Sequence, residues 1–523
     1  TINLYIKCLS LKFMAKHNNN NNGKAQEKDE KKLGITVKKS DNFSEWYTQL
    51  CAEQGADLVD TRYGVAGFVV HKPWAFKILR GIYDLLDKEI EEDGHEPLLF
   101  PTVIPEENLL KEEEHAGFAP DVFWITHGGN TKLERKLALR PTGETAFYPM
   151  YGLWIRSHND LPFKRFQSRI TVFRNEATTR PFLRGREFMF YETHDVFATH
   201  KEAMKQIDTD MKIMNEVAYE TLKIPFIFFK RPKWDKFLGA DDTYASDTIM
   251  PDGKRNQCSS THDLGQNFAK VYDVTFKDKD GKLKYGYQTC FGPGIYRLMA
   301  ALIAIHGDDN GLILPTAVTP IHIVIIPITF SKKPELTEKV LNKCKQVKEL
   351  IEKSCFGIKV KLDDEDKSPG YKYNKWELMG VPLRIEIGPR EADGDEVTIV
   401  NRISREKEKL NLKNIEKELN THINDFEVML KKRADEYFKG NTKDADSLEK
   451  VKKIIEEHRG FIKVPWCSTE KDGEKCAETL KAETMGGVVS GIKFESPEKP
   501  KKDQKCVICG KEAKHIVYVA KSY

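Results

Sequence analysis

The stretch from Arg169 to Phe197 constrains the fold of this chain more than any other part of the sequence. Polar and apolar residues alternate at both of its ends, and this period of two predicts a pair of β-strands. The segment between them, residues 177–185, contains Pro181 and Gly185 and is otherwise mostly polar, which is typical of a long loop. The sequence therefore predicts an antiparallel strand pair joined by a polar loop.

The side chains on one face of this predicted hairpin are typical of a ligand site. The first strand places Ile170, Val172, Arg174 and Glu176 on that face, and the second adds Phe188, Phe190, Glu192 and His194. An arginine has five donors and a permanent charge, so it suits a phosphate or a carboxylate, and a ring beside it can stack on a purine. The alternative is an ordinary amphipathic hairpin with solvated charges, but a buried face would not usually carry these groups together.

Length and charge limit the class of protein. The chain has 523 residues, enough for roughly three domains of ~150 residues each. Its net charge is only +4 at pH 7, so binding of a nucleic acid would require cations gathered in patches. No apolar run approaches the ~20 residues of a membrane span. We therefore expect a globular protein that does not cross a membrane.

Cysteine usage and the N-terminal segment bear on location. Six cysteines show no framework spacing, which argues for a reducing compartment; they are Cys8, Cys51, Cys258, Cys290, Cys344 and Cys355. Residues 1–40 are rich in Asn, Lys and Glu, and this composition predicts a disordered leader. A translated leader with the true start at Met14 fits this segment as well as a targeting peptide does. We expect a cytoplasmic protein.

Regular elements are predicted on both sides of the hairpin. Amphipathic spacing predicts helices over Phe43–Leu50, Pro73–Glu92 and Met204–Leu222. A strand over His95–Thr102 follows the second of these helices, and Pro101 interrupts it near its end.

Residues 137–145 alternate in polarity and then lead into Arg-Pro-Thr-Gly-Glu. Gly143 permits a ligand to approach the backbone closely. Thr142 and Glu144 offer a hydroxyl and a carboxylate two residues apart, which suits an amine with two N–H donors. The alternative is a helix N-terminus with Thr142 as the cap and Glu144 in the first turn.

Two further segments are rich in ligand-binding groups. Residues 256–268 are polar and predict a loop dense in hydrogen-bonding groups. Residues 291–299 open a helix that we expect to run to about residue 306. Gly292 and Gly294 let a ligand reach the N-terminus of that helix, which favours anions, and Arg297 lies in its first turns.

The pattern changes after residue 318. Strands alternate with helices, which predicts a small α/β domain; strands are expected at 321–327, 357–362, 383–387 and 397–400, and helices at 336–353 and 412–432.

The last segment, 436–523, contains two pairs of cysteines. Cys467 and Cys476 form a wide pair, and Cys506 and Cys509 form a Cys-x-x-Cys pair. Four thiolates match the tetrahedral coordination of zinc, and such a site is structural because it leaves no open position. Free thiols are the alternative.

Taken together, these segments resemble the class II aminoacyl-tRNA synthetases. The hairpin resembles motif 2, the helix, strand and proline at 73–101 resemble motif 1, and residues 291–299 resemble motif 3. Residues 140–144, the polar segment 256–268 and the cysteine-containing tail that ends on Tyr523 are similar to prolyl-tRNA synthetases of the archaeal and eukaryotic type. Ser260 departs mildly from that pattern, because the family often has Thr there.

The resemblance implies a role for each matched residue. For ATP it implies Arg174, Glu176, Arg184, Phe188, Gln257, Ser260, Gly292, Gly294 and Arg297. For proline it implies Thr142, Glu144, Arg174, Phe190, Glu192, Ser260 and His262. Arg174, Glu176 and Arg297 would act in catalysis. The anticodon would meet Lys372, Trp376, Glu386 and Arg390, and zinc would be bound by Cys467, Cys476, Cys506 and Cys509.

The resemblance also implies an α+β architecture. A class II antiparallel sheet is expected at 41–317, an α/β anticodon-binding domain at 318–435 and a zinc-binding domain at 436–523. Proline and ATP, with Mg²⁺, would give prolyl-adenylate, and the prolyl group would pass to tRNA(Pro) with release of AMP. The protein would be a homodimer through residues 73–101.

Two rival interpretations stay open at this point. One is another class IIa synthetase, for serine or threonine. The other is a synthetase-like RNA-binding or regulatory protein that no longer charges tRNA.

Overall fold

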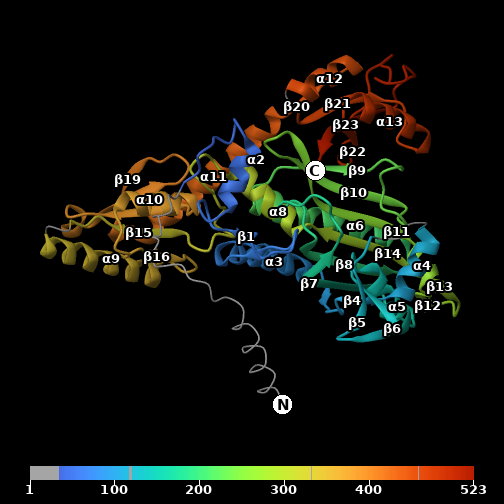
Figure 1. Cartoon of the computed structure of the whole chain (residues 1–523), viewed down its shortest axis with the longest axis horizontal. Coiled ribbons are helices and arrows are strands. Elements are labelled where there is room, and N and C mark those ends of the chain that lie inside the picture. The colour runs from blue at the N-terminus through green and yellow to red at the C-terminus, as the bar shows by residue number, and fades with distance from the viewer. Residues whose placement is uncertain (1–33, 117–120, 331–332, 458) are drawn as a thin grey trace, which may run out of the picture. The chain divides into compact units, whose positions relative to one another are not determined.

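The computed structural model describes residues 34–116, 121–330, 333–457 and 459–523. One large sheet contains strands from the part of the chain before residue 318 and from the part after residue 436 (Figure 1). Its strand order is β20-β21-β23-β22-β9-β10-β11-β14-β8-β7-β3. In that order the strands are Thr442–Asp444, Phe461–Trp466, His515–Ser522, Gly487–Lys493, Ile227–Lys230, Asp242–Ile249, Lys254–Gly265, Tyr287–Pro293, Glu187–Phe197, Phe163–Phe173 and Glu96–Pro97.

The predicted hairpin forms β7 and β8 near one edge of this sheet. The two strands are antiparallel, with Phe173 opposite Glu187. The prediction that Arg174 and Glu176 lie on the first strand is wrong, because β7 ends at Phe173 and both residues lie in the loop. The reason is local, since the Glu176 N–H donates to the Arg174 carbonyl over 2.9 Å and turns the chain out of the ladder.

Helices cover both faces of the central strands. Two neighbouring residues of β14 show this, because Phe291 packs in one core and Cys290 in another. The first core includes α2, α3, α6 and α8, and the second includes α5 and α7. These helices are α2 (Phe43–Cys51), α3 (Pro73–Glu92), α5 (Glu144–Trp154), α6 (His200–Met214), α7 (Asn267–Val271) and α8 (Ile295–Ala301), which continues as a π-helical turn over Leu302–His306.

The helices predicted from apolar spacing are confirmed. Helix α3 has the predicted bounds, and its apolar stripe is buried. The helix predicted at Met204–Leu222 begins earlier, after a capping box formed by Thr199 and Glu202. It ends in a π-helical turn over Asn215–Thr221.

Two predictions near the sheet need correction. Residues 256–268 are predicted as a loop, but most of them belong to β11, a central strand. Its polar side chains find partners inside the fold, as where Ser259 Oγ lies 2.7 Å from Ser246 Oγ. The strand predicted at His95–Thr102 is reduced to the two residues of β3, because its prolines have no N–H to continue a ladder.

Residues 323–440 form an α/β domain, as the alternation of strands and helices predicts. Its sheet has the order β16-β15-β17-β18-β19, with the first three strands parallel and the last two antiparallel. Helices α9 and α11 share one core with this sheet. The elements are β15 (Ile323–Pro327), α9 (Pro334–Ser354), β16 (Val360–Leu362), α10 (Pro369–Leu378), β17 (Leu383–Ile387), β18 (Glu396–Asn401), β19 (Lys407–Asn411) and α11 (Ile415–Gly440), and the boundary predicted after residue 435 falls inside α11.

The C-terminal segment extends the large sheet. Strand β22 pairs with β9, with Ile492 opposite Lys230. Strand β23 runs parallel to the start of β11, with Lys521 opposite Lys254. Helices α12 (Leu448–Glu457) and α13 (Glu474–Glu483) pack on these strands. The last residues of the chain are therefore brought to β11.

The predicted leader is only partly described. Residues 1–33 lie outside the described residues, whereas Thr36 N–H donates to Gln49 Oε1 of α2 over 2.8 Å. Described structure that contacts α2 therefore begins before residue 41. A small sheet beside it contains β4 (Val103–Pro105), β6 (Thr131–Leu139) and β5 (Trp124–Gly128), and α4 (Glu106–Ala116) lies between β4 and β5 in sequence.

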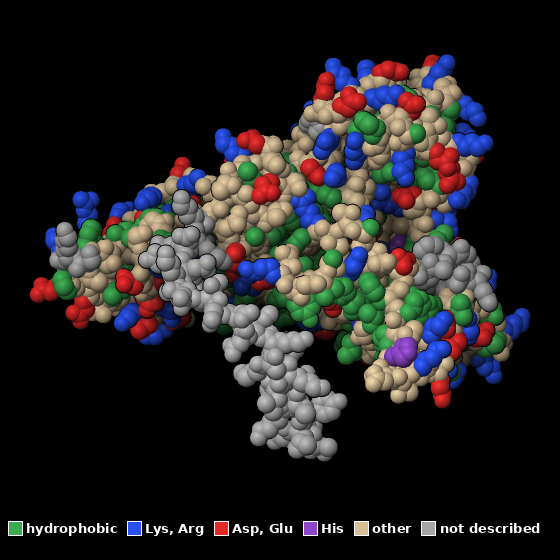
Figure 2. All heavy atoms as spheres, viewed as in Figure 1, with side chains coloured by type: hydrophobic (Ala, Val, Ile, Leu, Met, Phe, Trp, Pro, Cys, Tyr) green, Lys and Arg blue, Asp and Glu red, His purple; other side chains and the backbone are tan. Residues whose placement is uncertain are grey.

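Charges of both signs are distributed over the molecule. On the face shown in Figure 2, Lys and Arg side chains are interspersed with Asp and Glu over the α/β domain and the C-terminal part. This agrees with the nearly balanced charge of the chain. Within the described ranges, none of the helices has the length and apolar character needed to cross a membrane.

Candidate active site

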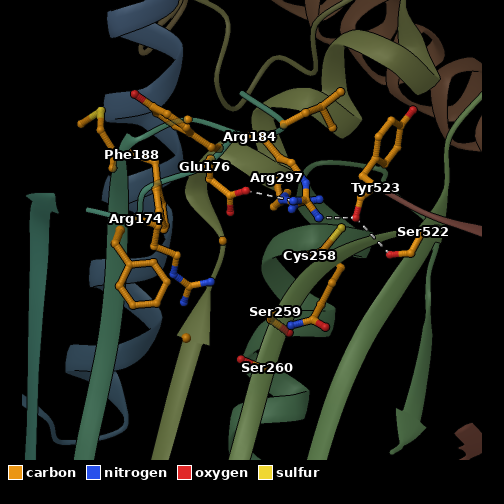
Figure 3. A pocket seen from close by; sticks show the side chains of 18 of the residues that line it. Arg174, Glu176, Arg184, Phe188, Cys258, Ser259, Ser260, Arg297, Ser522 and Tyr523 are labelled. Carbon is orange, nitrogen blue, oxygen red and sulfur yellow. Dashed lines mark hydrogen bonds and ion pairs between the residues drawn. The ribbon is translucent and has the colours of Figure 1, made fainter. Parts of the chain in front are cut away.

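One cavity collects the residues predicted to bind ATP. It has a volume of about 330 Å³ and lies where the loop after β7, the start of β8, β11 and the start of α8 meet (Figure 3). All of the predicted ATP-site residues line it, namely Arg174, Glu176, Arg184, Phe188, Gln257, Ser260, Gly292, Gly294 and Arg297. Phe190, predicted for proline, also lines it.

Three of the arginines that line this cavity come from two parts of the chain (Figure 3). Arg174 and Arg184 come from the loop between β7 and β8, and Arg297 comes from the first turns of α8. Arg184 donates to Glu176 Oε2 over 3.0 Å and to the backbone oxygen of Tyr523 over 2.6 Å. These two contacts fix the position of the Arg184 guanidinium in the wall of the cavity.

The three guanidinium groups influence one another. Asn256 Oδ1 accepts from Arg297 over 3.1 Å. Burial and the charge of Arg184 lower the pKa of Arg297. Desolvation in the cavity lowers the pKa of Arg174, and the charge of Glu176 opposes this effect. Cations that crowd together in this way produce a positive potential, which suits a polyphosphate.

Aromatic rings and a glycine shape the wall next to Arg174. Its guanidinium carbon lies 5.7 Å from the centroid of the Phe188 ring. Phe188 and Phe190 meet edge to face with centroids 6.1 Å apart. A Cβ on Gly292 would lie 3.2 Å from the Phe190 ring, so the glycine lets β14 approach that ring closely. An apolar ring beside a cation suits a purine base.

Two carboxylates lie at the start of α5. Glu144 is the first residue of this helix and is 2 % exposed, and its Oε2 accepts from Thr142 Oγ1. The N-cap is Gly143 and no side chain caps the helix, so the structure does not support the alternative in which Thr142 is the cap. A Cβ on Gly143 would lie 2.3 Å from Glu192 Oε1, so the glycine makes room for the second carboxylate. A pair of acids suits an ammonium group.

Buried side chains hold Glu192 in place. Gln167 Nε2 donates to its Oε1 over 2.7 Å, and His194 Nε2 lies 3.2 Å from its Oε2. The other ring nitrogen of His194 lies 3.0 Å from the Tyr148 hydroxyl. Burial acts to lower the pKa of His194, but the hydrogen bond and charge of Glu192 outweigh it and the pKa is raised. The sequence places His194 on the ligand-facing surface, whereas the structure buries it completely.

Strand register places the remaining residues predicted for proline. His262 of β11 lies opposite Cys290 of β14 and Thr243 of β10. Its Nδ1 is 3.0 Å from Thr243 Oγ1, and its ring centroid is 4.8 Å from that of Phe237. Burial lowers the pKa of His262 to about 3, so the imidazole is neutral near pH 7. Ser260 lies on the same strand, at the edge of the ATP cavity.

Sequence reasoning missed Arg255, Ser522 and Tyr523, which also line the cavity. Arg255 lies two residues before Gln257 on β11, and recognition of that strand would have placed both on one face. Ser522 and Tyr523 reach the cavity because β23 runs beside β11. Nothing local to Tyr523 indicates contact with Arg184, which is 339 positions away in sequence.

The residues predicted to read the anticodon differ in exposure. Lys372, Trp376 and Glu386 are buried. Lys372 Nζ and Trp376 Nε1 donate to the Asp363 carbonyl and carboxylate over 2.9 and 2.6 Å. Arg390 is exposed. Of the four, the structure leaves Arg390 open to a nucleic acid and gives the buried three contacts inside the domain.

The four predicted zinc ligands meet in the C-terminal domain. The sulfur atoms of Cys467, Cys476, Cys506 and Cys509 lie within 4.8 Å of one another. Burial and the charge of Cys506 raise the pKa of Cys467 to about 11. Burial also acts to raise the pKa of Cys509, but hydrogen bonds, above all from the Lys511 N–H, outweigh it and lower this pKa. The cluster could hold a metal ion.

Known families match three successive parts of the chain. The tRNA synthetase class II core domain (G, H, P, S and T) matches residues 123–306, and the anticodon binding domain matches residues 322–422. The prolyl-tRNA synthetase C-terminal domain matches residues 448–523. This last match decides between proline and the rival substrates serine and threonine.

Similar proteins cover nearly the whole chain. The proline--tRNA ligase of Thermofilum pendens is 52% identical over 496 residues, which are 94% of this chain and 99% of that protein. The proline--tRNA ligase of Methanococcoides burtonii is 43% identical over 497 residues, or 94% of this chain and 100% of that protein.

Solved structures agree with the sequence comparisons. The Giardia lamblia prolyl-tRNA synthetase in complex with prolyl-adenylate has a TM-score of 0.88 and 34% identity, and covers 94% of this chain and 99% of that one. The Cryptosporidium parvum prolyl-tRNA synthetase complexed with L-proline and AMP has a TM-score of 0.86 and 30% identity, and covers 97% and 100%. Because domain order, site geometry and relatives agree, this chain belongs to the prolyl-tRNA synthetases, the proline--tRNA ligases of class II.

Proposed function

We propose that Arg174, Glu176 and Arg297 carry out proline activation in the cavity described above. The proline carboxylate attacks the α-phosphate of ATP, the bond from the α- to the β-phosphate breaks, and pyrophosphate leaves. Arg174 neutralises the α-phosphate, while Arg184 and Arg297 hold the departing pyrophosphate. Glu176 orients Arg184 through their 3.0 Å ion pair. The tRNA ribose hydroxyl then attacks the acyl carbon, and AMP leaves.

Catalysis of both steps rests on positioning and charge, and no side chain forms a covalent intermediate. The observation that carries the proposal is that Arg174 and Arg184, from the loop between β7 and β8, and Arg297, from α8, line one cavity. ATP would place its adenine against Phe188 and its phosphates near Gln257, Gly292 and Gly294.

We assign the proline amine to Glu144 and Thr142 at the start of α5, with Glu192 close by. An ammonium group has N–H donors, and the oxygen atoms of these side chains can accept hydrogen bonds from them. His262, Phe190 and Ser260 would line the rest of the proline site. Neutrality of His262 supports this assignment, since a cation there would repel the substrate amine.

Mg²⁺ would accompany ATP. Among the residues assigned to the ATP site, Glu176 has the carboxylate oxygens that Mg²⁺ prefers, and phosphate oxygens would supply further ligands. The ion would neutralise charge on the phosphates.

Zinc is proposed at Cys467, Cys476, Cys506 and Cys509. The four sulfurs converge as a tetrahedral thiolate site requires, and an ion there would be structural. Elemental analysis of protein purified without chelator should find about one zinc per chain. Absence of metal from such a preparation would overturn this assignment.

Arg390 is proposed to read the anticodon, because an exposed arginine can pair bidentately with a guanine edge. The buried Lys372, Trp376 and Glu386 support the shape of that domain. Arg390→Ala should weaken charging of tRNA(Pro) and spare pyrophosphate exchange. A parallel fall in exchange would assign Arg390 to the structure instead.

A homodimer through residues 73–101 is also proposed. The apolar stripe of α3 is buried within the chain, but β3 is an edge strand and Leu99 is 80 % exposed. A second copy would cover this edge. Measurement of the mass in solution at micromolar concentration tests the proposal, and a monomer would contradict it.

The scattered cysteines favour a cytoplasmic location.

The test of the proposed activity is ATP–pyrophosphate exchange with each candidate amino acid. Exchange should require proline and should not occur with serine or threonine. No exchange with any amino acid would favour the alternative of a synthetase-like protein that binds RNA without charging it.

A further inference from the structure

A buried arginine connects the ATP cavity with the C-terminal domain. Arg231 follows β9, and its side chain is 2 % exposed. Its terminal nitrogens hold both oxygens of Asp247 over 2.7 and 2.8 Å. They also donate to the Ser490 carbonyl of β22 over 2.7 Å and to Gln257 Oε1 over 2.8 Å. These lengths are typical of charge-assisted hydrogen bonds.

The contact with Arg231 determines which end of the Gln257 amide faces the cavity. A guanidinium group only donates, so Gln257 must turn its carbonyl oxygen toward Arg231. The amide NH₂ group is then left for the cavity, which Gln257 lines with an exposed side chain. Gln257 can therefore donate to a phosphate or ribose oxygen, but it does not present an acceptor there.

Strand geometry explains why Gln257 needs this support. Gln257 lies opposite Asp247, beside an irregularity where the pairing of β10 with β11 shifts by one residue at Cys258. A bulge of this kind re-aims the neighbouring side chains. The direction of Gln257 is then set by its contact with Arg231, and Asp247 and Ser490 in turn fix Arg231.

We propose that Arg231 is a positioning residue for adenylate formation, which holds the NH₂ group of Gln257 toward the nucleotide. Arg231 is not among the residues that line the cavity, so it acts through Gln257 and does not touch ATP. Strand β22 supplies one of the acceptors that hold Arg231, the Ser490 carbonyl. The position of Arg231 therefore also depends on docking of the C-terminal domain. The proposal rests on the assignment of Gln257 to the ATP site.

Arg231→Lys tests the proposal. Lysine keeps a charge beside Asp247, so no buried carboxylate loses its counter-ion, but one ammonium cannot replace a fork that spans three acceptors. In proline-dependent exchange the KM for ATP should rise about tenfold while the KM for proline stays unchanged, because a misplaced binding group costs up to ~10²-fold. Gln257→Ala should have a similar effect, and Arg231→Lys should add nothing to it.

The double variant separates positioning from a general structural role. If the two effects on the KM for ATP multiply, Arg231 does not act through Gln257 and the proposal is overturned. If Gln257→Ala alone leaves the KM for ATP unchanged, the ATP-site assignment of Gln257 is the part that fails. Absence of any exchange by the wild-type chain would instead contradict the proposed activity.

Two further variants complete the experiment. Arg402→Lys is the matched control, because Arg402 is also 2 % exposed and holds both oxygens of Asp308 over 2.7 and 2.9 Å, but lies outside the ATP cavity. It should leave the KM for ATP unchanged. Gln257→Glu keeps the acceptor for Arg231 and replaces the donors toward the cavity with a carboxylate. It should raise the KM for ATP at least as much as Gln257→Ala, and a neutral result would overturn the inferred orientation even if Arg231→Lys failed to fold.

Discussion

Among single residues, Arg174 has the most direct assignment to the reacting phosphate. The backbone N–H of Arg174 donates to the Arg186 carbonyl over 2.9 Å and anchors the main chain there. The Arg174 guanidinium lies beside Phe188. Arg174→Ala should reduce proline-dependent exchange by about 10²–10³, because one preorganised charge donor is lost. Exchange measured at saturating ATP and proline checks this.

Arg169→Ala provides the control for Arg174→Ala. Arg169 lies in β7, five residues before Arg174, but it is partly exposed and pairs with Asp84 and Asp87 on the surface. Its loss should leave exchange close to the wild-type value, since exposed ion pairs contribute little. Near-normal exchange by folded Arg174→Ala protein would contradict the assignment.

His262 predicts a dependence of stability on pH. Its folded pKa is about 3, against about 6.5 in an unfolded chain, so the unfolded state binds the proton first. The stability due to neutral His262 is complete above about pH 6.5 and is lost as the pH falls toward 3. Between pH 7 and pH 5 this loss amounts to about 2 kcal/mol.

His262→Gln should remove that part of the pH dependence. Unfolding in urea at pH 7 and pH 5 measures the difference, and the variant should lose about 2 kcal/mol less than the wild type over this interval. Equal losses in the two proteins would show that His262 is not buried and neutral in solution.

At the scale of elements, helices with a clear apolar stripe were predictable and the polar strand was not. The period of the apolar residues locates α3, because burial of one helix face dictates the sequence there. Strand β11 carries polar side chains that line the cavity or bond within the sheet, so it lacks the alternation that identifies a strand. The motif residues were nevertheless assigned to one ATP site, because their motifs resemble those of the class II synthetases.

The start of α5 allows a test at this scale. A Cβ on Gly143 would lie 2.3 Å from Glu192 Oε1, while the φ of −95° at Gly143 is open to any residue. Gly143→Ala should therefore displace Glu192 without straining the backbone, and we expect the KM for proline to rise about tenfold. Exchange at varied proline concentration measures this change.

Gly370→Ala is the matched glycine substitution. A Cβ there would meet nothing within 4 Å, and the residue lies in helix α10. This variant should leave the KM for proline unchanged and gain a few tenths of a kcal/mol or more in helix stability. If Gly143→Ala behaved in the same way, the proposed proline site would lose its second carboxylate.

At the scale of the whole molecule, the C-terminal domain contributes Ser522 and Tyr523 to the wall of the cavity. Its cysteines could be recognised from spacing, but its pairing with the catalytic sheet could not, because the contacts join residues hundreds of positions apart. Strand β22 extends the sheet through β9, and β23 reaches β11 beside the ATP cavity. The spacing of the cysteines thus predicted the C-terminal domain, but only the fold shows that its strands pair with β9 and β11.

Tyr523 connects the C-terminal domain with the loop between β7 and β8. Its hydroxyl donates to Asp252 Oδ1 over 2.7 Å, and its backbone oxygen accepts from Arg184 over 2.6 Å. The ring therefore anchors a backbone oxygen that orients Arg184, a cation in the wall of the cavity. A hydrogen bond to a charged group contributes about 1.5–3 kcal/mol, so Tyr523→Ala should raise the KM for ATP about tenfold or more. Tyr523→Phe keeps the ring and loses only the bond to Asp252, so it should have a smaller effect. Equal KM values for ATP in the wild type and Tyr523→Ala would show that Arg184 is held by Glu176 alone.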